Sequence, residues 1–200
     1  MKYPQIDSKL FIENRARFIK QLKPNSIAIF NSNYEYVWNG DSSHTFKQHS
    51  DMIWLSGIDQ EDSILVIYPD CPIPDFREVL FLKQTNEHIA VWEGHKYTKE
   101  EVTSASGIKS IFWNNEFEAK IRQVVNLADN IYLPLNENNR FGYKSPYKDL
   151  DFAHEMKSKF PLHNYERTAP ILHRLRSIKS ETELALMRTA AGISKKGFER

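Results

Sequence analysis

The chain has 200 residues, of which 40% are hydrophobic and 26% are charged, and its formal net charge is +1. These proportions are typical of a globular chain that buries a core, and the scattered Lys and Arg residues argue against a nucleic-acid or anionic-membrane partner. No apolar stretch reaches the roughly 20 residues of a membrane helix, and the amino terminus lacks the apolar core of a signal peptide. We therefore expect a soluble, cytoplasmic protein, in which the single Cys71 excludes an intramolecular disulfide and a Cys-based zinc cage.

The first half of the chain is predicted to begin with a helix and to continue as strands. Asp7 or Ser8 can cap the helix, and the apolar spacing that follows carries it to Pro24. The polar stretch 31–50 is interpreted as a loop. Short apolar runs predict four strands, over residues 26–30, 52–55, 64–68 and 79–82.

The second half alternates between helical and strand patterns. Thr98 and Glu101 form a capping box for a short helix, and Asn115 can cap a longer one with an apolar stripe. Strands are predicted over 108–112 and 130–133, a loop over 136–146 and a helix over about 147–160. This mixture predicts an α/β domain in which helices pack on a mixed sheet.

The last thirty residues have a different character. Residues 170–180 alternate basic and apolar side chains and are interpreted as a joint, after which Ser180 and Glu183 form another capping box. The helix that follows has an apolar face and no stop signal before Arg200, and such a face needs something to cover it. We therefore expect one domain over residues 1–170, and over 171–200 the linker and first helix of a second, truncated domain.

Few residues in the chain carry an obvious chemical signature. There is no phosphate-binding loop, dinucleotide fingerprint, HExxH motif or nucleophile elbow. His44 and His49 could ligate a metal, but a loop gives no helical pairing of the two rings, so solvated polar residues are the favoured interpretation. Trp92 stands two residues before Gly94, which allows two interpretations: a Trp held at a surface or interface by a sharp turn, or a half-buried core Trp.

Three strings, taken together, resemble the aminopeptidase P family. Residues 41–51, continuing to 54–57, are similar to the signature of its N-terminal domain, apart from Thr45, Lys47 and His49, where the family usually has Pro, Arg and Asn. Residues 79–81 followed by 92–96 are similar to its Leu-Phe and Trp-x-Gly element. Residues 175–191 look like the start of its catalytic "pita-bread" domain.

The resemblance implies a creatinase/aminopeptidase P N-terminal-type fold and a parent metallopeptidase. That enzyme removes the first residue of peptides with proline second, and two metal ions, usually manganese, activate the attacking water. The metal ligands lie in the following domain, so we assign no catalytic or metal-binding residue here and expect the chain alone to be inactive. The resemblance also implies a dimer or tetramer, with Asp41 and Trp92 contributing to substrate binding at a neighbouring subunit.

Two alternatives remain open at this stage. A prolidase, which cleaves only Xaa-Pro dipeptides, shares this N-terminal design. A non-enzymatic α/β module for binding or assembly is the alternative of a different class, but it would leave the apolar face of the last helix exposed.

Overall fold

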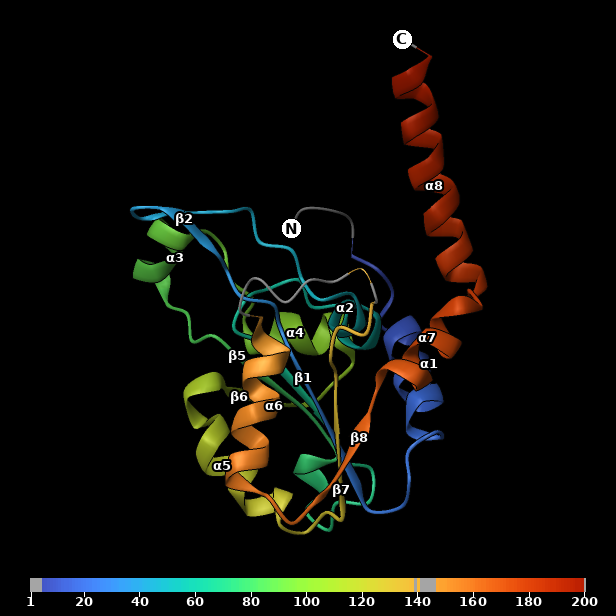
Figure 1. Ribbon diagram of the computed structural model, residues 1–200. Coiled ribbons are helices and arrows are strands. Elements are labelled where there is room, and N and C mark those ends of the chain that lie inside the picture. The colour runs from blue at the N-terminus through green and yellow to red at the C-terminus, as the bar shows by residue number, and fades with distance from the viewer. Residues whose placement is uncertain (1–4, 139, 141–146, 200) are drawn as a thin grey trace.

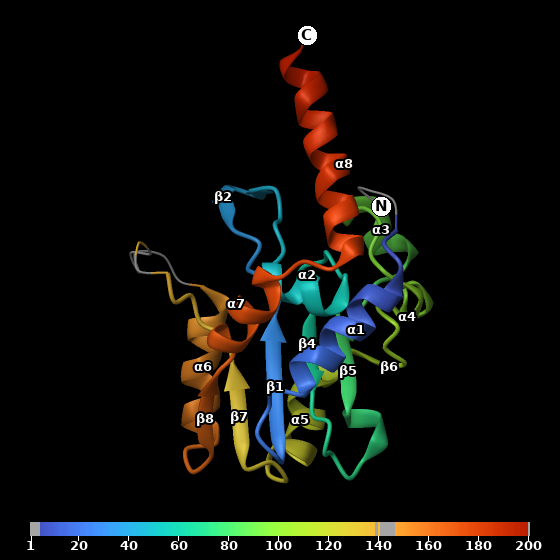
Figure 2. The same cartoon turned by 90° about the vertical axis from the view of Figure 1, so that its right-hand side faces the viewer.

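The computed structural model describes residues 5–138, 140 and 147–199. A six-stranded sheet in the order β6-β5-β4-β1-β7-β8 forms its centre (Figures 1 and 2). The strands are β1 (Ser26–Asn31), β4 (Ile64–Ile67), β5 (Glu78–Leu82), β6 (Ser110–Trp113), β7 (Asn130–Leu133) and β8 (Asn164–Arg167). Strand β4 pairs antiparallel with both neighbours, whereas β1–β7, β7–β8 and β5–β6 are parallel. Five strands of this sheet therefore run one way and β4 runs the other.

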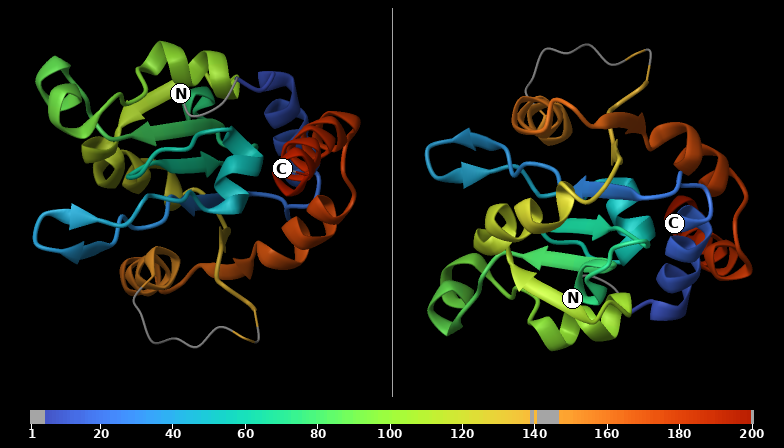
Figure 3. Two further views of the ribbon diagram at one scale, coloured as in Figure 1. Left: turned by 90° about the horizontal axis from the view of Figure 1, so that it is seen from above. Right: turned by 90° about the horizontal axis from the view of Figure 1, so that it is seen from below.

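Helices cover both faces of the sheet (Figure 3). The helices are α1 (Ser8–Ile19), α2 (Ser50–Ser56), α3 (Glu87–Glu93), α4 (Lys99–Ser106), α5 (Phe117–Val125), α6 (Lys148–Lys159), α7 (Ala169–Ser177) and α8 (Glu181–Phe198). Side chains of β1 alternate between two cores: Ile27 and Ile29 pack with α5 and α6, while Ala28 and Phe30 pack with α1, α2, α4 and α7. The predicted α/β class with helices on a mixed sheet is confirmed.

A buried arginine ties the second of these cores together. Arg15 of α1 is 1% exposed and forms an ion pair of 2.9 Å with Glu78 of β5. Its guanidinium also donates to the carbonyl oxygens of Leu55 and Ser106 at 2.9 and 3.0 Å. These carbonyls lie at the carboxyl ends of α2 and α4, where a cation is favoured. The Arg15 side chain therefore caps the carboxyl ends of two helices and links both helices to the sheet.

Most of the predicted elements are confirmed. Asp7 caps α1 by accepting a hydrogen bond of 2.9 Å from the backbone N–H of Lys9. Both predicted capping boxes are present, at the starts of α4 and α8. The predicted strands at β1, β4, β5 and β7 are correct, and the predicted strand 108–112 appears two residues later as β6.

The predicted strand at 52–55 is wrong, because these residues form α2. His49 caps the helix, and Gly57 ends it at φ +73°. An apolar run this short does not show whether its hydrophobic residues recur with the period of a strand or with that of a buried helix. At Gly57 an added Cβ would lie 2.4 Å from the Phe11 ring, so packing as well as backbone conformation favours glycine there.

Other differences involve short or polar elements. The predicted loop 31–50 contains a hairpin of β2 (Val37–Asn39) and β3 (Ser42–Ser43), and the predicted joint 170–180 contains most of α7. Strand β8 and helix α3 were not predicted. Asn115 does not cap α5 but lies within a 3-10 turn over Asn114–Glu116 that precedes it. In the predicted loop 136–146, residues 139 and 141–146 lie outside the described residues.

Helix α8 projects away from the body of the molecule (Figure 1). Its apolar residues are exposed: Leu186, Met187, Ile193 and Phe198. Among the described residues, no helix has both the length and the hydrophobicity that crossing a bilayer requires.

Candidate functional site

The first predicted site residue, Asp41, lies at the tip of a projecting hairpin. Asn39 pairs with Ser42, so Gly40 and Asp41 form a two-residue turn. Gly40 has φ +56°, which glycine adopts without the steric cost that a Cβ brings. The Asp41 carboxylate is exposed. Behind it, the exposed Trp38 contacts the ring of His44 at a centroid distance of 6.0 Å.

The second predicted site residue, Trp92, lies on α3 and is 80% exposed. Val91 beside it is also exposed, and Gly94 turns the chain immediately after the helix at φ +78°. Of the two interpretations made from sequence, the structure supports a surface Trp and not a half-buried core Trp.

The hairpin and α3 project from the same end of the sheet (Figure 1) but lie apart when the molecule is seen from above (Figure 3). Asp41 and Trp92 therefore do not form a single pocket within one chain. Each of the two residues instead exposes its side chain at this end of the molecule.

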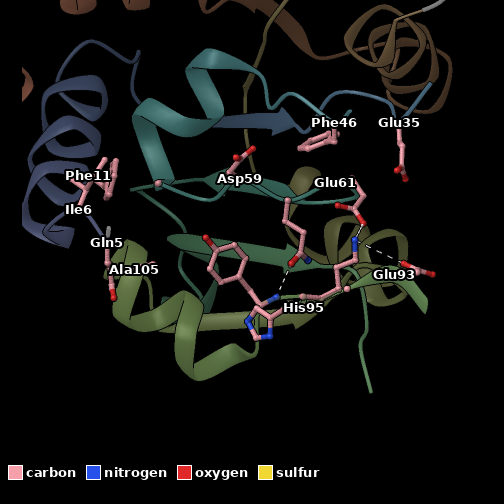
Figure 4. A pocket seen from close by; sticks show the side chains of 15 residues that line it. Gln5, Ile6, Phe11, Glu35, Phe46, Asp59, Glu61, Glu93, His95 and Ala105 are labelled. Atoms are coloured by element: carbon pink, nitrogen blue, oxygen red, sulfur yellow. Dashed lines mark hydrogen bonds and ion pairs between the residues drawn. The ribbon is translucent and has the colours of Figure 1, made fainter. Parts of the chain in front are cut away.

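A cavity of about 500 Å³ lies near the bases of the hairpin and α3, since its lining includes Glu35, Phe46 and residues 93–97. In Figure 4 its walls divide into an apolar end, with Ile6, Phe11 and Ala105, and an end that carries Glu61 and Glu93. The sequence patterns did not indicate it, because its lining comes from five separate segments: 5–11, 35–46, 57–61, 93–97 and Ala105.

Ion pairs organise the acidic end of this cavity. The Lys96 ammonium pairs with the buried carboxylate of Glu61 and lies 4.0 Å from Glu93. Lys83, the residue after β5, lies 3.7 Å from Glu61 and also pairs with Glu93. Burial acts to raise the pKa of Glu61, but the hydrogen bond from Lys96 and the nearby lysine charges outweigh it and hold that pKa below its usual value.

The two histidines considered as metal ligands have other contacts. His44 packs against Trp38, as described above. His49 caps α2, since its Nδ1 accepts the backbone N–H of Asp51 at 3.3 Å. Its Nε2 lies 3.8 Å from the Asp149 carboxylate. Burial lowers the pKa of His49.

A buried polar cluster joins α2 to α6 and α7, and it was not predicted. Asp51 of α2 pairs with Arg176 of α7, and Asp149 of α6 lies beside them, 5% exposed. Burial, together with the negative charge of Asp51, raises the pKa of Asp149 to about 7. Asp51 falls within the string 41–57, but nothing in the sequence indicates that its partners lie about 100 residues away.

Within the described part of the chain, no group of three or more His, Cys, Asp and Glu side chains is arranged to hold a metal ion. The described residues therefore do not fit a dinuclear metal centre.

The relatives found by comparison with known proteins are consistent with the observed fold. The family "Aminopeptidase P, N-terminal domain" matches residues 11–132. The chain is 22% identical to the Xaa-Pro aminopeptidase of Escherichia coli over 196 residues, covering 95% of the chain and 43% of that protein. It is 25% identical to intermediate cleaving peptidase 55 of Saccharomyces cerevisiae over 209 residues, covering 98% of the chain and 40% of that protein.

Solved structures of other proteins have a fold similar to that of this chain. Aminopeptidase PepP of Pseudomonas aeruginosa superimposes with a TM-score of 0.76 at 23% identity, covering 95% of the chain and 43% of that chain. An E. coli aminopeptidase P with the inhibitor Pro-Leu gives a TM-score of 0.73 at 20% identity, with 95% and 43% covered. The chain thus spans less than half the length of these relatives.

Proposed function

The chain belongs to the aminopeptidase P N-terminal-domain family, and we propose that it forms the amino-terminal part of a metal-dependent Xaa-Pro aminopeptidase. Such an enzyme hydrolyses the bond between a peptide's first residue and a proline in second position. The family match over residues 11–132 carries the proposal. The peptidase names of relatives that are more than twice as long support it.

In this proposal residues 1–170 form the N-terminal domain and residues 171–200 lead into the catalytic domain. Two features support this division: the exposed apolar side chains of α8, and the chain's coverage of only 43% of the E. coli relative. The catalytic domain would hold two metal ions, taken to be manganese, and would cover the apolar face of α8. The 200-residue chain alone would then be inactive.

Asp41 and Trp92 are proposed to act at the active site of a neighbouring subunit in a dimer or tetramer. Both are exposed on elements that project from one end of the molecule, where a second subunit could approach. An indole face suits the ring of a substrate proline, and a carboxylate suits the free amine of its first residue. Neither residue would take part in bond cleavage itself.

The proposal is tested with the parent protein encoded by the gene. The reading frame is expected to continue past Arg200 with two Asp, one His and two Glu as metal ligands. The purified parent should cleave an Arg-Pro-Pro peptide, lose that activity in EDTA and regain it with Mn²⁺, whereas residues 1–200 alone should show no cleavage. Hydrolysis of Xaa-Pro dipeptides without tripeptides would instead establish a prolidase. A reading frame that stops near Arg200 would leave only a binding or assembly module.

A further inference from the structure

We propose that Glu61 is a positioning residue: its carboxylate holds the two ends of the segment that carries Trp92, and so fixes that indole for contact with substrate. The role toward substrate rests on the proposed function, which places Trp92 at the active site of a neighbouring subunit. The anchoring of α3 by Glu61 does not depend on that function and is tested separately.

Helix α3 has few described contacts of its own with the body of the molecule. The α3 residues whose side chains the structure describes are all exposed: His88, Val91, Trp92 and Glu93. With seven residues, the helix is also well below the length at which isolated helices are stable in water. The described contacts that set its position therefore come from the residues at its two ends.

These two ends meet at one buried carboxylate. Lys83 precedes α3 and Lys96 follows it, and both ammonium groups approach the same oxygen, Oε1 of Glu61. Lys96 donates a hydrogen bond to this oxygen, while Lys83 lies 3.7 Å from it. Glu93, the last residue of α3, pairs with Lys83 and lies 4.0 Å from Lys96 (Figure 4). Two carboxylates thus neutralise two ammonium groups that would otherwise repel each other.

Of these four charged groups, Glu61 is the one that belongs to the buried body. It is 7% exposed, and the loop around it is fixed by further hydrogen bonds. The backbone carbonyl of Gln60 accepts the Gln48 amide at 2.9 Å, and the Ser63 hydroxyl donates to the carbonyls of Gln60 and Glu61 at 3.0 and 3.3 Å. The side-chain oxygen of Gln60 also accepts the backbone N–H of Tyr97 at 2.7 Å. Glu61 therefore offers a fixed point to the more exposed segment 83–96.

The charges that make these contacts are retained at neutral pH. The pKa of Glu61 is held below its usual value, as described above. Burial acts to lower the pKa of Lys83, but its hydrogen bond to Glu93 and the nearby carboxylate charges outweigh it, so that pKa is raised. Hydrogen bonds between charged groups are among the stronger ones, and salt screens a buried pair less than an exposed one.

The position of Trp92 in the sequence makes it depend on these contacts. Trp92 directly precedes Glu93 and stands four positions before Lys96, so fixing those two residues limits how far the indole can move. A contact made by an 80% exposed side chain is weakened when that side chain has to be ordered on binding. Loss of Glu61 should therefore weaken the hold on substrate without changing bond cleavage.

NMR relaxation of the ¹⁵N-labelled 200-residue chain tests the anchoring of α3. In the parent chain, the order parameters of the backbone amides of residues 88–94 and of the Trp92 indole N–H should be about 0.8, as in rigid structure. In Glu61→Gln they should fall below about 0.6. Trp92→Phe identifies the indole resonance. Order parameters that stay unchanged in Glu61→Gln would overturn the proposal.

Other substitutions separate this anchoring from a general loss of charge. Glu118→Gln is the matched control, because Glu118 also accepts hydrogen bonds from two cations, Arg122 and Lys159, but is exposed on α5; it should leave residues 88–94 unchanged. Lys96→Met should mobilise α3 as Glu61→Gln does, whereas Lys96→Arg keeps the charge and should keep α3 ordered. This second pair decides the question even where Glu61→Gln does not fold, and equal mobility in its two members would overturn the proposal.

Kinetics of the full-length enzyme test the role toward substrate. Glu61→Gln should raise the KM for a Xaa-Pro tripeptide about threefold to fivefold and change kcat by less than about twofold. In a Trp92→Ala background it should have no further effect, because Glu61 acts through the indole. Additive losses would overturn the positioning role. If Trp92→Ala itself left the kinetics unchanged, the proposed substrate contact would fail and the positioning role with it, while the order parameters would still decide whether Glu61 anchors α3.

Discussion

The indole N–H of Trp54 donates a hydrogen bond of 2.9 Å to the carboxylate of Glu183, 129 positions later in the chain. The same carboxylate accepts the backbone N–H of Ser180 at 2.7 Å and so closes the capping box of α8. Burial acts to raise the pKa of Glu183, but these hydrogen bonds, with the charge of Arg17, hold it below its usual value. The direction of α8 is therefore set by contact with α2.

This relationship predicts the effect of Trp54→Phe, which keeps the aromatic packing and removes the N–H donor. Amides in the first two turns of α8 should exchange with solvent about threefold to tenfold faster, because one part-buried hydrogen bond to a charged group is lost. Hydrogen–deuterium exchange over residues 180–190 measures this. Trp38→Phe, at an exposed indole on the hairpin, is the control and should leave exchange in α8 unchanged; equal exchange in both variants would show that the hydrogen bond does not position the helix.

Arg15→Met should lower the free energy of unfolding by about 3 kcal/mol, since Glu78 would lose its buried partner and two helix-end carbonyls would lose their donor. Urea denaturation measures the loss. Arg122→Met removes an exposed arginine that pairs with Glu118 at 3.0 Å on α5, and should cost no more than about 0.5 kcal/mol. Similar losses in the two variants would contradict the central role given to Arg15.

The raised pKa of Asp149 predicts a pH dependence of stability. Its folded pKa of about 7 lies above the ordinary value of 3.8, so between these limits the folded state binds more protons than the unfolded state. The free energy of unfolding should therefore fall as pH rises from about 4 to 8, by on the order of 2–4 kcal/mol from this group alone. The depressed pKa of His49 acts in the opposite direction, favouring stability above pH 6.5.

Asp149→Asn isolates the contribution of the carboxyl group, because the amide keeps its shape and cannot ionise. The variant should be more stable than the parent at pH 8 and about equal to it near pH 4, as followed by urea denaturation at each pH. Asp75→Asn, at an exposed site, should follow the parent throughout. A constant difference between Asp149→Asn and the parent across this range would mean that Asp149 is ionised throughout.

Trp92→Ala tests the proposed contact with substrate in the full-length parent enzyme. The value of kcat/KM for a Xaa-Pro tripeptide should fall about tenfold, through loss of an aromatic wall, while metal content and thermal stability stay the same. Leu162→Ala, at a residue 97% exposed in the turn before β8, serves as the control. Unchanged kinetics in Trp92→Ala would mean that the indole is only a surface residue.

Local signals in the sequence predicted most of the fold. Capping boxes and apolar stripes located α4, α5 and α8, because such signals depend on residues only three or four positions apart. Strand β8 was not predicted because it pairs only with β7 and has the polar sequence Asn164–Arg167, which carries no apolar pattern. Helix α2 was mistaken for a strand because its apolar run is too short to show a period.

Less of the candidate site could be predicted from the sequence. Resemblance drew attention to Asp41 and Trp92, and the structure shows both to be exposed, but their role remains a proposal. The cavity and the contacts at the joint depend on which loops the topology brings together. Arg176, for example, is 125 positions from Asp51, and no spacing rule connects such residues.

The single reversed strand divides the molecule into two unlike ends. Because β4 alone runs against the other five strands, β1 and β5 point the same way. The segments that follow them, the hairpin and α3, therefore leave the sheet at the same end (Figures 1 and 2). The opposite end holds short connections, including the turn with Leu162. That turn is therefore a suitable place for a dye or a surface tether, and a protein immobilised there would keep its other end open to soluble partners.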